Sequence, residues 1–72
     1  MKKIKKIKIR INGKVQFIND NSKISDLVRN LKIPTKKVAI ELNQEIIDKK
    51  NINNIILKKN DKIEIVHFIG GG

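Results

Sequence analysis

The last ten residues, Ile63-Glu-Ile-Val-His-Phe-Ile-Gly-Gly-Gly72, combine a strand pattern with a run of glycines. Ile63 and Ile65 are β-branched and two positions apart, which favours a strand with both side chains on one face. Three of the four glycines in the chain then occupy positions 70–72. Glycine weakens regular structure because it loses the most backbone freedom on folding. The stretch therefore predicts a final strand that leads into a flexible tail at residues 70–72.

Length and composition limit what the rest of the chain can be. Its 72 residues allow a single domain, 1–72, with a small core. The absence of cysteine excludes disulfides, thiolate metal sites and a thiol nucleophile. Only Phe17 and Phe68 are aromatic, so aliphatic side chains must form the core. The apolar runs are too short to cross a membrane, and the basic start lacks the apolar stretch of a signal peptide, which favours a cytoplasmic location.

The first half of the chain opens with a hairpin pattern. Isoleucine alternates with lysine and arginine over Lys6–Ile11, which predicts a half-buried strand. Asn12-Gly13 follows, and both residues tolerate the positive φ angles of a tight type I′ turn. Val15 and Phe17 resume the alternation as a second strand. Residues 1–5 precede this register and are expected to be frayed.

A short helix is expected after the hairpin, because apolar residues recur there at spacings of three and four. Ser25 is expected to cap this helix, with Asp26 favourable near its N-terminus. Pro34 is expected to end it, because the residue before a proline is pushed out of the helical region. The apolar face consists of Ile24, Leu27, Val28 and Leu31.

Strand patterns dominate the second half. Val38–Leu42 alternates as a third strand, and Asn43-Gln44 turns the chain into a brief strand at residues 45–47. Residues 52–57 are expected to form an irregular or 3₁₀ segment that closes one edge of the core. The predicted order is β-β-α-β-β-β, with the last strand beside the first. The fold class is α+β: a mixed four- to five-stranded sheet packed on one short helix.

The glycine tail suggests a chemical use besides fraying. Side-chain-free residues can thread a narrow channel, and three extended residues reach about 10 Å. They would present the carboxylate of Gly72 to the site of another enzyme. That group is a poor electrophile because it is anionic at neutral pH. Adenylation by ATP would supply a leaving group, and a sulfur nucleophile could then replace it to leave a thiocarboxylate.

The final strand suggests where a partner would dock. If Ile63 and Ile65 face the core, Val66 and Phe68 lie on the opposite face, close to the tail. Adjacent exposed apolar residues indicate a docking patch, so we expect Val66 and Phe68, flanked by Ile69, to contact the activating enzyme. His67 and the scattered aspartates form no recognisable catalytic or metal-binding pattern. We expect no catalytic residue and no metal ligand in this chain.

The formal net charge of +10 raises the alternative of nucleic-acid binding. Lysines, however, are spread over the whole sequence in pairs, and no aromatic platform for bases lies among them. A nucleic-acid binder is therefore disfavoured. Electrostatic steering toward an acidic protein partner is the preferred explanation of the charge.

Taken together, the stretch from Ile7 to Gly72 resembles the ThiS family of sulfur carriers in thiamine biosynthesis. The element order also looks like the β-grasp architecture of ubiquitin-like proteins. The most specific parts are the third-strand and terminal segments, and a bare diglycine alone selects only a mechanistic class. The segments that carry the resemblance are INGK at 11–14, SDLVRNL at 25–31, VAIELNQEII at 38–47 and DKIEIVHFIGGG at 61–72.

The resemblance implies a defined cycle. A ThiF-type adenylyltransferase, using ATP and magnesium, would activate Gly72. Sulfur from a cysteine desulfurase relay would convert the acyl-adenylate into a thiocarboxylate, which the thiazole synthase ThiG would consume. Gly71 and Gly72 match the essential diglycine of the family, and Gly70 extends the flexible segment. The chain would bind no cofactor itself and would be a protein cosubstrate, not an enzyme.

Other carriers with the same terminal motif remain as alternatives. A molybdopterin-type sulfur carrier would differ in the acceptor enzyme that binds it, and a ubiquitin-like modifier would form isopeptide bonds through Gly72. The basic extension before Ile7 is longer than the usual start of the family, and the resemblance does not predict the positive charge. We expect the protein to act as a monomer.

Overall fold

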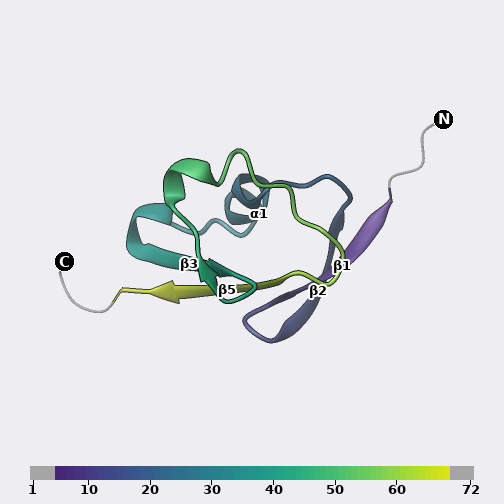
Figure 1. Cartoon of the computed structure of the whole chain (residues 1–72), viewed down its shortest axis with the longest axis horizontal. Coiled ribbons are helices and arrows are strands. Elements are labelled where there is room, and N and C mark those ends of the chain that lie inside the picture. Colours follow the sequence, from purple (N-terminus) through teal and green to yellow (C-terminus); the bar gives the residue numbers. More distant parts are fainter. Residues whose placement is uncertain (1–4, 69–72) are drawn as a thin grey trace.

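Five β-strands and one α-helix form the regular structure of residues 5–68, the part of the chain that the computed structural model describes (Figure 1). Residues 1–4 and 69–72, which include most of the expected frayed start and the whole expected tail, lie outside the described residues. In chain order the elements are β1 (Lys6–Ile11), β2 (Lys14–Asn19), α1 (Ile24–Asn30), the 3₁₀ helix η1 (Thr35–Lys37), β3 (Val38–Leu42), β4 (Glu45–Ile46), the 3₁₀ helix η2 (Lys49–Asn51) and β5 (Lys62–His67).

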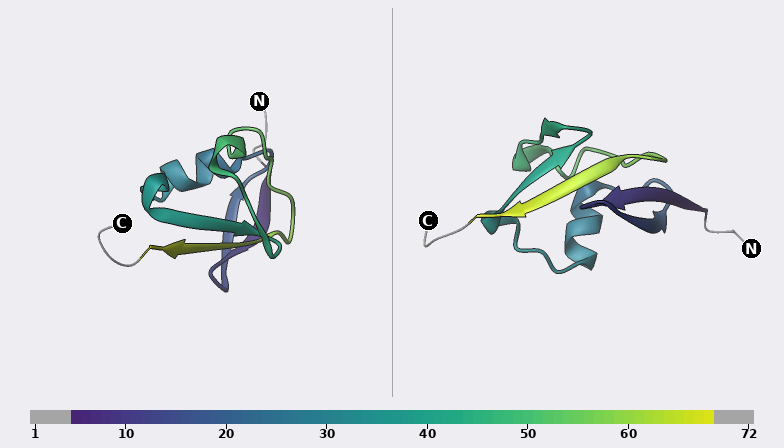
Figure 2. Two further views of the ribbon diagram at one scale, coloured as in Figure 1. Left: turned by 60° about the vertical axis from the view of Figure 1, so that its left-hand side comes forward. Right: turned by 90° about the horizontal axis from the view of Figure 1, so that it is seen from below.

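The sheet is mixed and has the strand order β2-β1-β5-β3-β4. β1 and β5 run parallel, with Ile11 opposite Ile63, whereas the other neighbouring strands are antiparallel. The helix α1 lies against one face of the sheet, and the other face is left uncovered (Figure 1, Figure 2). The predicted α+β fold, with the last strand beside the first and one short helix on the sheet, is confirmed.

Two tight turns connect antiparallel strands, and both use left-handed backbone at two successive residues. Asn12 and Gly13 have φ angles of 50° and 83°, and Asn43 and Gln44 have φ angles of 52° and 74°. This conformation matches a type I′ turn, whose twist suits a two-residue hairpin. Both predicted turns are therefore confirmed. Lys5, at the start of the described chain, accepts a hydrogen bond through its carbonyl from the N–H of Asp20 at 2.8 Å.

The core lies between the sheet and α1, and isoleucine dominates it. Alternate residues of β1, β3 and β5 point toward the helix, as their period of two predicts. Burying each of these aliphatic side chains contributes about 1.5–3 kcal/mol of transfer free energy. The core side chains are no more than 9% exposed: Ile9, Ile11, Ile24, Leu27, Val28, Val38, Ile40, Ile52, Leu57, Ile63 and Ile65.

The start of α1 differs from the prediction that Ser25 caps it. Ser25 lies inside the helix and is buried, and the residue at the cap position is Lys23. The N–H groups of Ile24 and Ser25 donate to the carbonyls of Ile55 and Ile52, at 3.0 and 3.1 Å. The loop that contains Ile52 and Ile55 thus accepts hydrogen bonds from N–H groups at the helix start, which have no partner within the helix. Asp26 acts as expected near this end, since its carboxylate accepts from the N–H of Lys23 at 2.9 Å.

The end of α1 is also set differently from the prediction. The helix stops at Asn30, and Lys32 has a left-handed backbone with φ of 57°. The N–H of Ile33 then donates to the carbonyl of Val28 at 2.9 Å, which closes the last turn before Pro34 is reached. Leu31, predicted on the apolar face, is 42% exposed because it lies past the helix. Within residues 5–68, no helix has the length and apolar character needed to span a membrane.

The segment between β4 and β5 closes one side of the core, as predicted. Ile52 and Leu57 are buried in it, while Ile56 is exposed and forms an isolated bridge with Lys23. The 3₁₀ turn lies earlier than predicted, at Lys49–Asn51. The side chain of Asp48 starts this turn by accepting from the N–H of Lys50 at 2.9 Å.

Candidate functional site

The candidate site is the C-terminal end of β5 with its exposed apolar residues, and contacts along the strand fix its position. Asn43 holds the beginning of the strand. Its main-chain N–H donates to the carbonyl of Lys62 at 2.7 Å, and its side-chain oxygen accepts from the N–H of Lys62 at 2.9 Å. The turn between β3 and β4 is thereby tied to the first residue of β5.

Asn12 holds the middle of β5. Its side-chain oxygen accepts from the N–H of Ile65 at 2.8 Å, and its amide nitrogen donates to the carbonyl of Ile65 at 3.3 Å. The regular β1–β5 ladder ends at the pair of Ile11 and Ile63. The side chain of Asn12 therefore continues the parallel pairing beyond the end of β1.

The last described residue, Phe68, is held through its main chain and its ring. Its N–H donates to the carbonyl of Lys37 at 2.9 Å, which extends the β3–β5 pairing past Val38 and His67. The ammonium of Lys49 lies 5.3 Å from the centroid of the Phe68 ring. That separation is within the range of a cation–π contact, about 6 Å.

Lys49 is a residue whose role the sequence analysis missed. Its ammonium donates to the carbonyls of Thr35 and Val38, at 2.8 and 2.9 Å. In the sequence it reads as one half of a surface lysine pair with Lys50, and no local pattern separates the two. Only the fold, which places η2 beside η1 and the start of β3, distinguishes them.

The terminal patch, defined as Val66 and Phe68, consists of one residue on the outer face of β5 and the residue that directly follows the strand. Val66 is 54% and Phe68 59% exposed, whereas Ile63 and Ile65 are buried. Within β5, the predicted inner face at Ile63 and Ile65 and outer face at Val66 are therefore confirmed. Ile69, the third expected docking residue, and Gly70, Gly71 and Gly72 lie outside the described residues. Docking by this patch stays a prediction.

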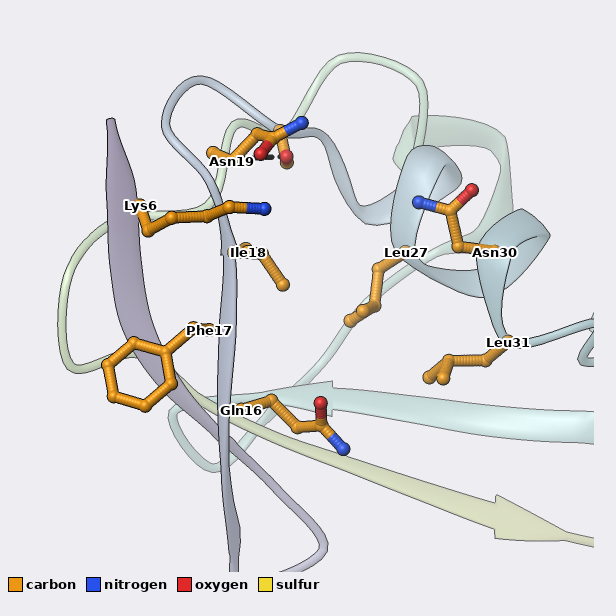
Figure 3. A pocket seen from close by; sticks show the side chains of 9 residues that line it. Lys6, Gln16, Phe17, Ile18, Asn19, Leu27, Asn30 and Leu31 are labelled. Atoms are coloured by element: carbon orange, nitrogen blue, oxygen red, sulfur yellow. Dashed lines mark hydrogen bonds between the residues drawn. The ribbon is translucent and has the colours of Figure 1, made fainter. Parts of the chain in front are cut away.

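A second exposed apolar pair, Val15 and Phe17, lies on β2. Figure 3 shows the Phe17 ring on the side of the strand away from α1. Ile18, Leu27 and Leu31 instead point into a shallow groove between β2 and α1 (Figure 3). β1 separates this edge strand from β5, so the groove and the terminal patch belong to different strands.

His67 lies on the inner-face register of β5, opposite Val38, and its side chain is exposed at the rim of the sheet. It lines a shallow depression together with Leu31 and Ile33. Across residues 5–68, no three histidine, aspartate or glutamate side chains gather in a group that could hold a metal ion.

This geometry defines a class of protein. A mixed sheet packed on one helix, with parallel first and last strands as central neighbours, is the β-grasp domain of ubiquitin-like proteins. The exposed apolar residues Val66 and Phe68 precede the glycines at positions 70–72 in the sequence. The chain belongs to the ThiS family, whose family model matches residues 7–72.

Individual relatives agree with this assignment. The chain is 42% identical over 65 residues to the sulfur carrier protein ThiS of Bacillus subtilis, covering 89% of this chain and 98% of that protein. The crystal structure of the thiamine biosynthesis protein ThiS from Geobacter metallireducens superposes with a TM-score of 0.77 at 27% identity, covering 92% of this chain and 100% of that one.

A third relative is a longer protein. The thiazole synthase of Magnetococcus marinus is 33% identical over 66 residues, which are 92% of this chain and 20% of that protein. The present chain thus spans about a fifth of that thiazole synthase.

Proposed function

We propose that this protein is a sulfur carrier that brings sulfur to thiazole formation in thiamine biosynthesis, with the carboxylate of Gly72 as the carrying group. One observation carries the proposal: the ThiS family match extends over residues 7–72 and so includes the terminal glycines. The identity of 42% with the sulfur carrier of Bacillus subtilis supports it.

The chemistry needs a bare main-chain terminus. A partner adenylyltransferase, using ATP and magnesium, joins the carboxylate of Gly72 to AMP and releases pyrophosphate. The terminal sulfur of a persulfide then attacks the activated carbonyl, and AMP leaves with one former carboxylate oxygen, so that an acyl persulfide forms. A partner thiol cleaves its S–S bond, which leaves the thiocarboxylate on Gly72 and a disulfide between that thiol and the sulfur donor. Gly70 and Gly71 present no side chain to the walls of the partner's channel. The chain acts as a protein cosubstrate, and the partners supply the catalytic groups.

The partners follow from this cycle. A thiazole synthase of the ThiG type receives the sulfur, a ThiF-type enzyme activates the carrier, and a cysteine desulfurase relay supplies the sulfur. The thiazole synthase of Magnetococcus marinus supports the first of these, because it includes a segment similar to this chain within its own polypeptide. Fusing two partners raises their effective concentration for each other. We place the protein in the cytoplasm, where these enzymes would act.

We assign docking to the terminal patch together with Ile69. Val66 lies on, and Phe68 directly after, a strand that is held at its beginning, middle and end, so their main-chain positions are defined before a partner binds. Their exposure leaves apolar surface available for burial in an interface. The net charge of +10 would steer this face toward an acidic partner surface.

The decisive experiment is intact-mass spectrometry after incubation with a ThiF-type adenylyltransferase, ATP, magnesium, a persulfide donor and a thiol reductant that cleaves the acyl persulfide. We expect the mass gain of one oxygen-to-sulfur exchange, and we expect the gain to be absent from a variant that lacks Gly72. Transfer of this sulfur should then depend on a thiazole synthase. An unchanged mass with an adenylyltransferase that thiolates the Bacillus subtilis carrier in the same assay would contradict the proposal, and conjugates on lysines of other proteins would indicate a modifier.

A further inference from the structure

Lys49 occupies an unusual place for a lysine of a basic, lysine-rich surface. It is partly buried, and its ammonium donates two hydrogen bonds to main-chain carbonyls, those of Thr35 and Val38. These two residues flank Lys37, whose own carbonyl accepts the N–H of Phe68. One side chain thus joins η1, the first residue of β3 and the residue that follows β5.

The same ammonium lies 5.3 Å from the centroid of the Phe68 ring. Phe68 is therefore fixed at two points, by its main chain at Lys37 and by its ring at Lys49. The ring remains 59% exposed, so the contact with Lys49 orients it without burying it in the core. Because the ring is exposed, the contact adds little to the stability of the core. Its main effect is to restrict the orientation of the ring.

Orientation of this ring matters for binding. An exposed side chain with free rotamers loses conformational entropy when a partner immobilises it, and a ring already held in one orientation loses less. The two carbonyl acceptors also fix the position of the Lys49 ammonium, so the charge beside the ring does not move freely as it would on an unpaired surface lysine.

We propose that Lys49 is a positioning residue of the carrier cycle, which holds the Phe68 ring ready for docking on the adenylyltransferase. This inference rests on the proposed function and on the docking role of the terminal patch. Lys49 takes no part in the adenylation chemistry itself. Its effect on the reaction is transmitted through the orientation of the Phe68 ring.

The chain offers a matched control in Lys50. It lies in the same 3₁₀ helix and is exposed, and its ammonium makes no hydrogen bond or ion pair within residues 5–68. Lys49→Met and Lys50→Met remove the same charge, so they change long-range steering alike. A difference between them isolates the contact with Phe68 and the two carbonyls.

The test is pyrophosphate release by a ThiF-type adenylyltransferase, measured against the concentration of the full-length carrier. Relative to Lys50→Met, we expect Lys49→Met to raise KM roughly two- to fivefold at unchanged kcat, the size of a cation–π contact expressed as affinity. Lys49→Arg keeps the charge and the donors and should restore most of the loss. Phe68→Leu should raise KM as well, and adding Lys49→Met to it should have almost no further effect.

A second measurement keeps the contact testable if Lys49→Met folds poorly. In the NMR spectrum of the wild-type carrier, the ε-methylene protons of Lys49 should be shifted by the ring current of Phe68, and Phe68→Leu should abolish that shift. Equal KM values for Lys49→Met and Lys50→Met, additive effects in the double variant, or an unshifted Lys49 signal would each overturn the positioning role alone. No adenylation of the wild-type chain would overturn the proposed function, and the positioning role with it.

Discussion

Asn12 and Ile65 are joined by two hydrogen bonds across a separation of 53 residues in the chain. The N–H of Ile65 donates to the side-chain oxygen of Asn12 at 2.8 Å, and the carbonyl of Ile65 accepts from its amide nitrogen at 3.3 Å. The side chain of this one turn residue therefore pairs with both the N–H and the carbonyl of Ile65, in the middle of β5. Because β1 ends at Ile11, no main-chain partner on that strand replaces Asn12.

We expect Asn12→Gly to destabilise the protein by about 1–3 kcal/mol, because it leaves the partly buried N–H and carbonyl of Ile65 without these partners. Glycine accepts the φ of 50° at this position, so turn strain does not confuse the result. Asn60→Gly is the matched control: its φ is 71°, and its side chain makes no hydrogen bond within residues 5–68. Chemical denaturation measures both, and equal losses would contradict the role of Asn12.

The hairpins show what local sequence can predict. Asn12, Gly13 and Asn43 adopt the left-handed conformations that their residue types favour, and the alternation of Ile63 and Ile65 assigns the inner face of β5 correctly. These features depend on the residues themselves and on a period of two. The outward direction of Val66 on β5 follows from the same period of two.

Features that depend on distant partners could not be predicted in this way. Ser25 looks like a helix cap, yet the carbonyls of Ile52 and Ile55 accept from the first helical N–H groups. Phe17 is one of only two aromatic residues, yet it is 65% exposed because the register places it on the uncovered face. Lys49 and Lys50 are adjacent in the sequence and no local sequence pattern separates them. Only the tertiary structure places the ammonium of Lys49 beside Phe68.

The inner face of the sheet should be sensitive to truncation, in contrast to the outer face. Ile40 is fully buried, at 0% exposure, opposite Ile65 on β5. We expect Ile40→Ala to lower the free energy of unfolding by about 2–5 kcal/mol through lost burial and the cavity left behind. Ile46→Ala, at a position that is 77% exposed, removes the same atoms and should change it by less than about 0.5 kcal/mol. Thermal or chemical unfolding compares them, and similar losses would refute the assignment of the core.

Docking through the terminal patch can be separated from general surface hydrophobicity. Phe68→Ala and Phe17→Ala remove the same ring from exposed positions, 59% exposed directly after β5 and 65% exposed on β2. We expect Phe68→Ala to raise the KM of the adenylyltransferase for the carrier about tenfold or more. A tenfold change corresponds to about 1.4 kcal/mol of binding free energy. Phe17→Ala should leave KM and kcat near the wild-type values. Normal activation of a folded Phe68→Ala variant would remove the patch from the docking site.

Steering by the positive charge should appear in the salt dependence of activation. With a net charge of +10, association with an acidic partner should slow as salt screens the attraction, whose range is about 10 Å at 0.1 M ionic strength. We expect kcat/KM for adenylation to fall as sodium chloride is raised, at nearly constant kcat. Steering changes the rate at which the two proteins meet and not the rate of the chemical step, so added salt should raise KM and leave kcat nearly unchanged.

Charges close to the docking site should contribute most to this steering. Lys36 lies in η1, next to the Lys37 carbonyl that holds Phe68, whereas Lys14 starts the edge strand β2. Both are exposed, and Lys36→Gln and Lys14→Gln each remove one charge. At low salt, Lys36→Gln should reduce kcat/KM more than Lys14→Gln, and the difference should vanish at high salt. A salt-independent kcat/KM would contradict steering, and tight, salt-sensitive binding to nucleic acid that survives deletion of Gly71 and Gly72 would assign the charge to a different partner.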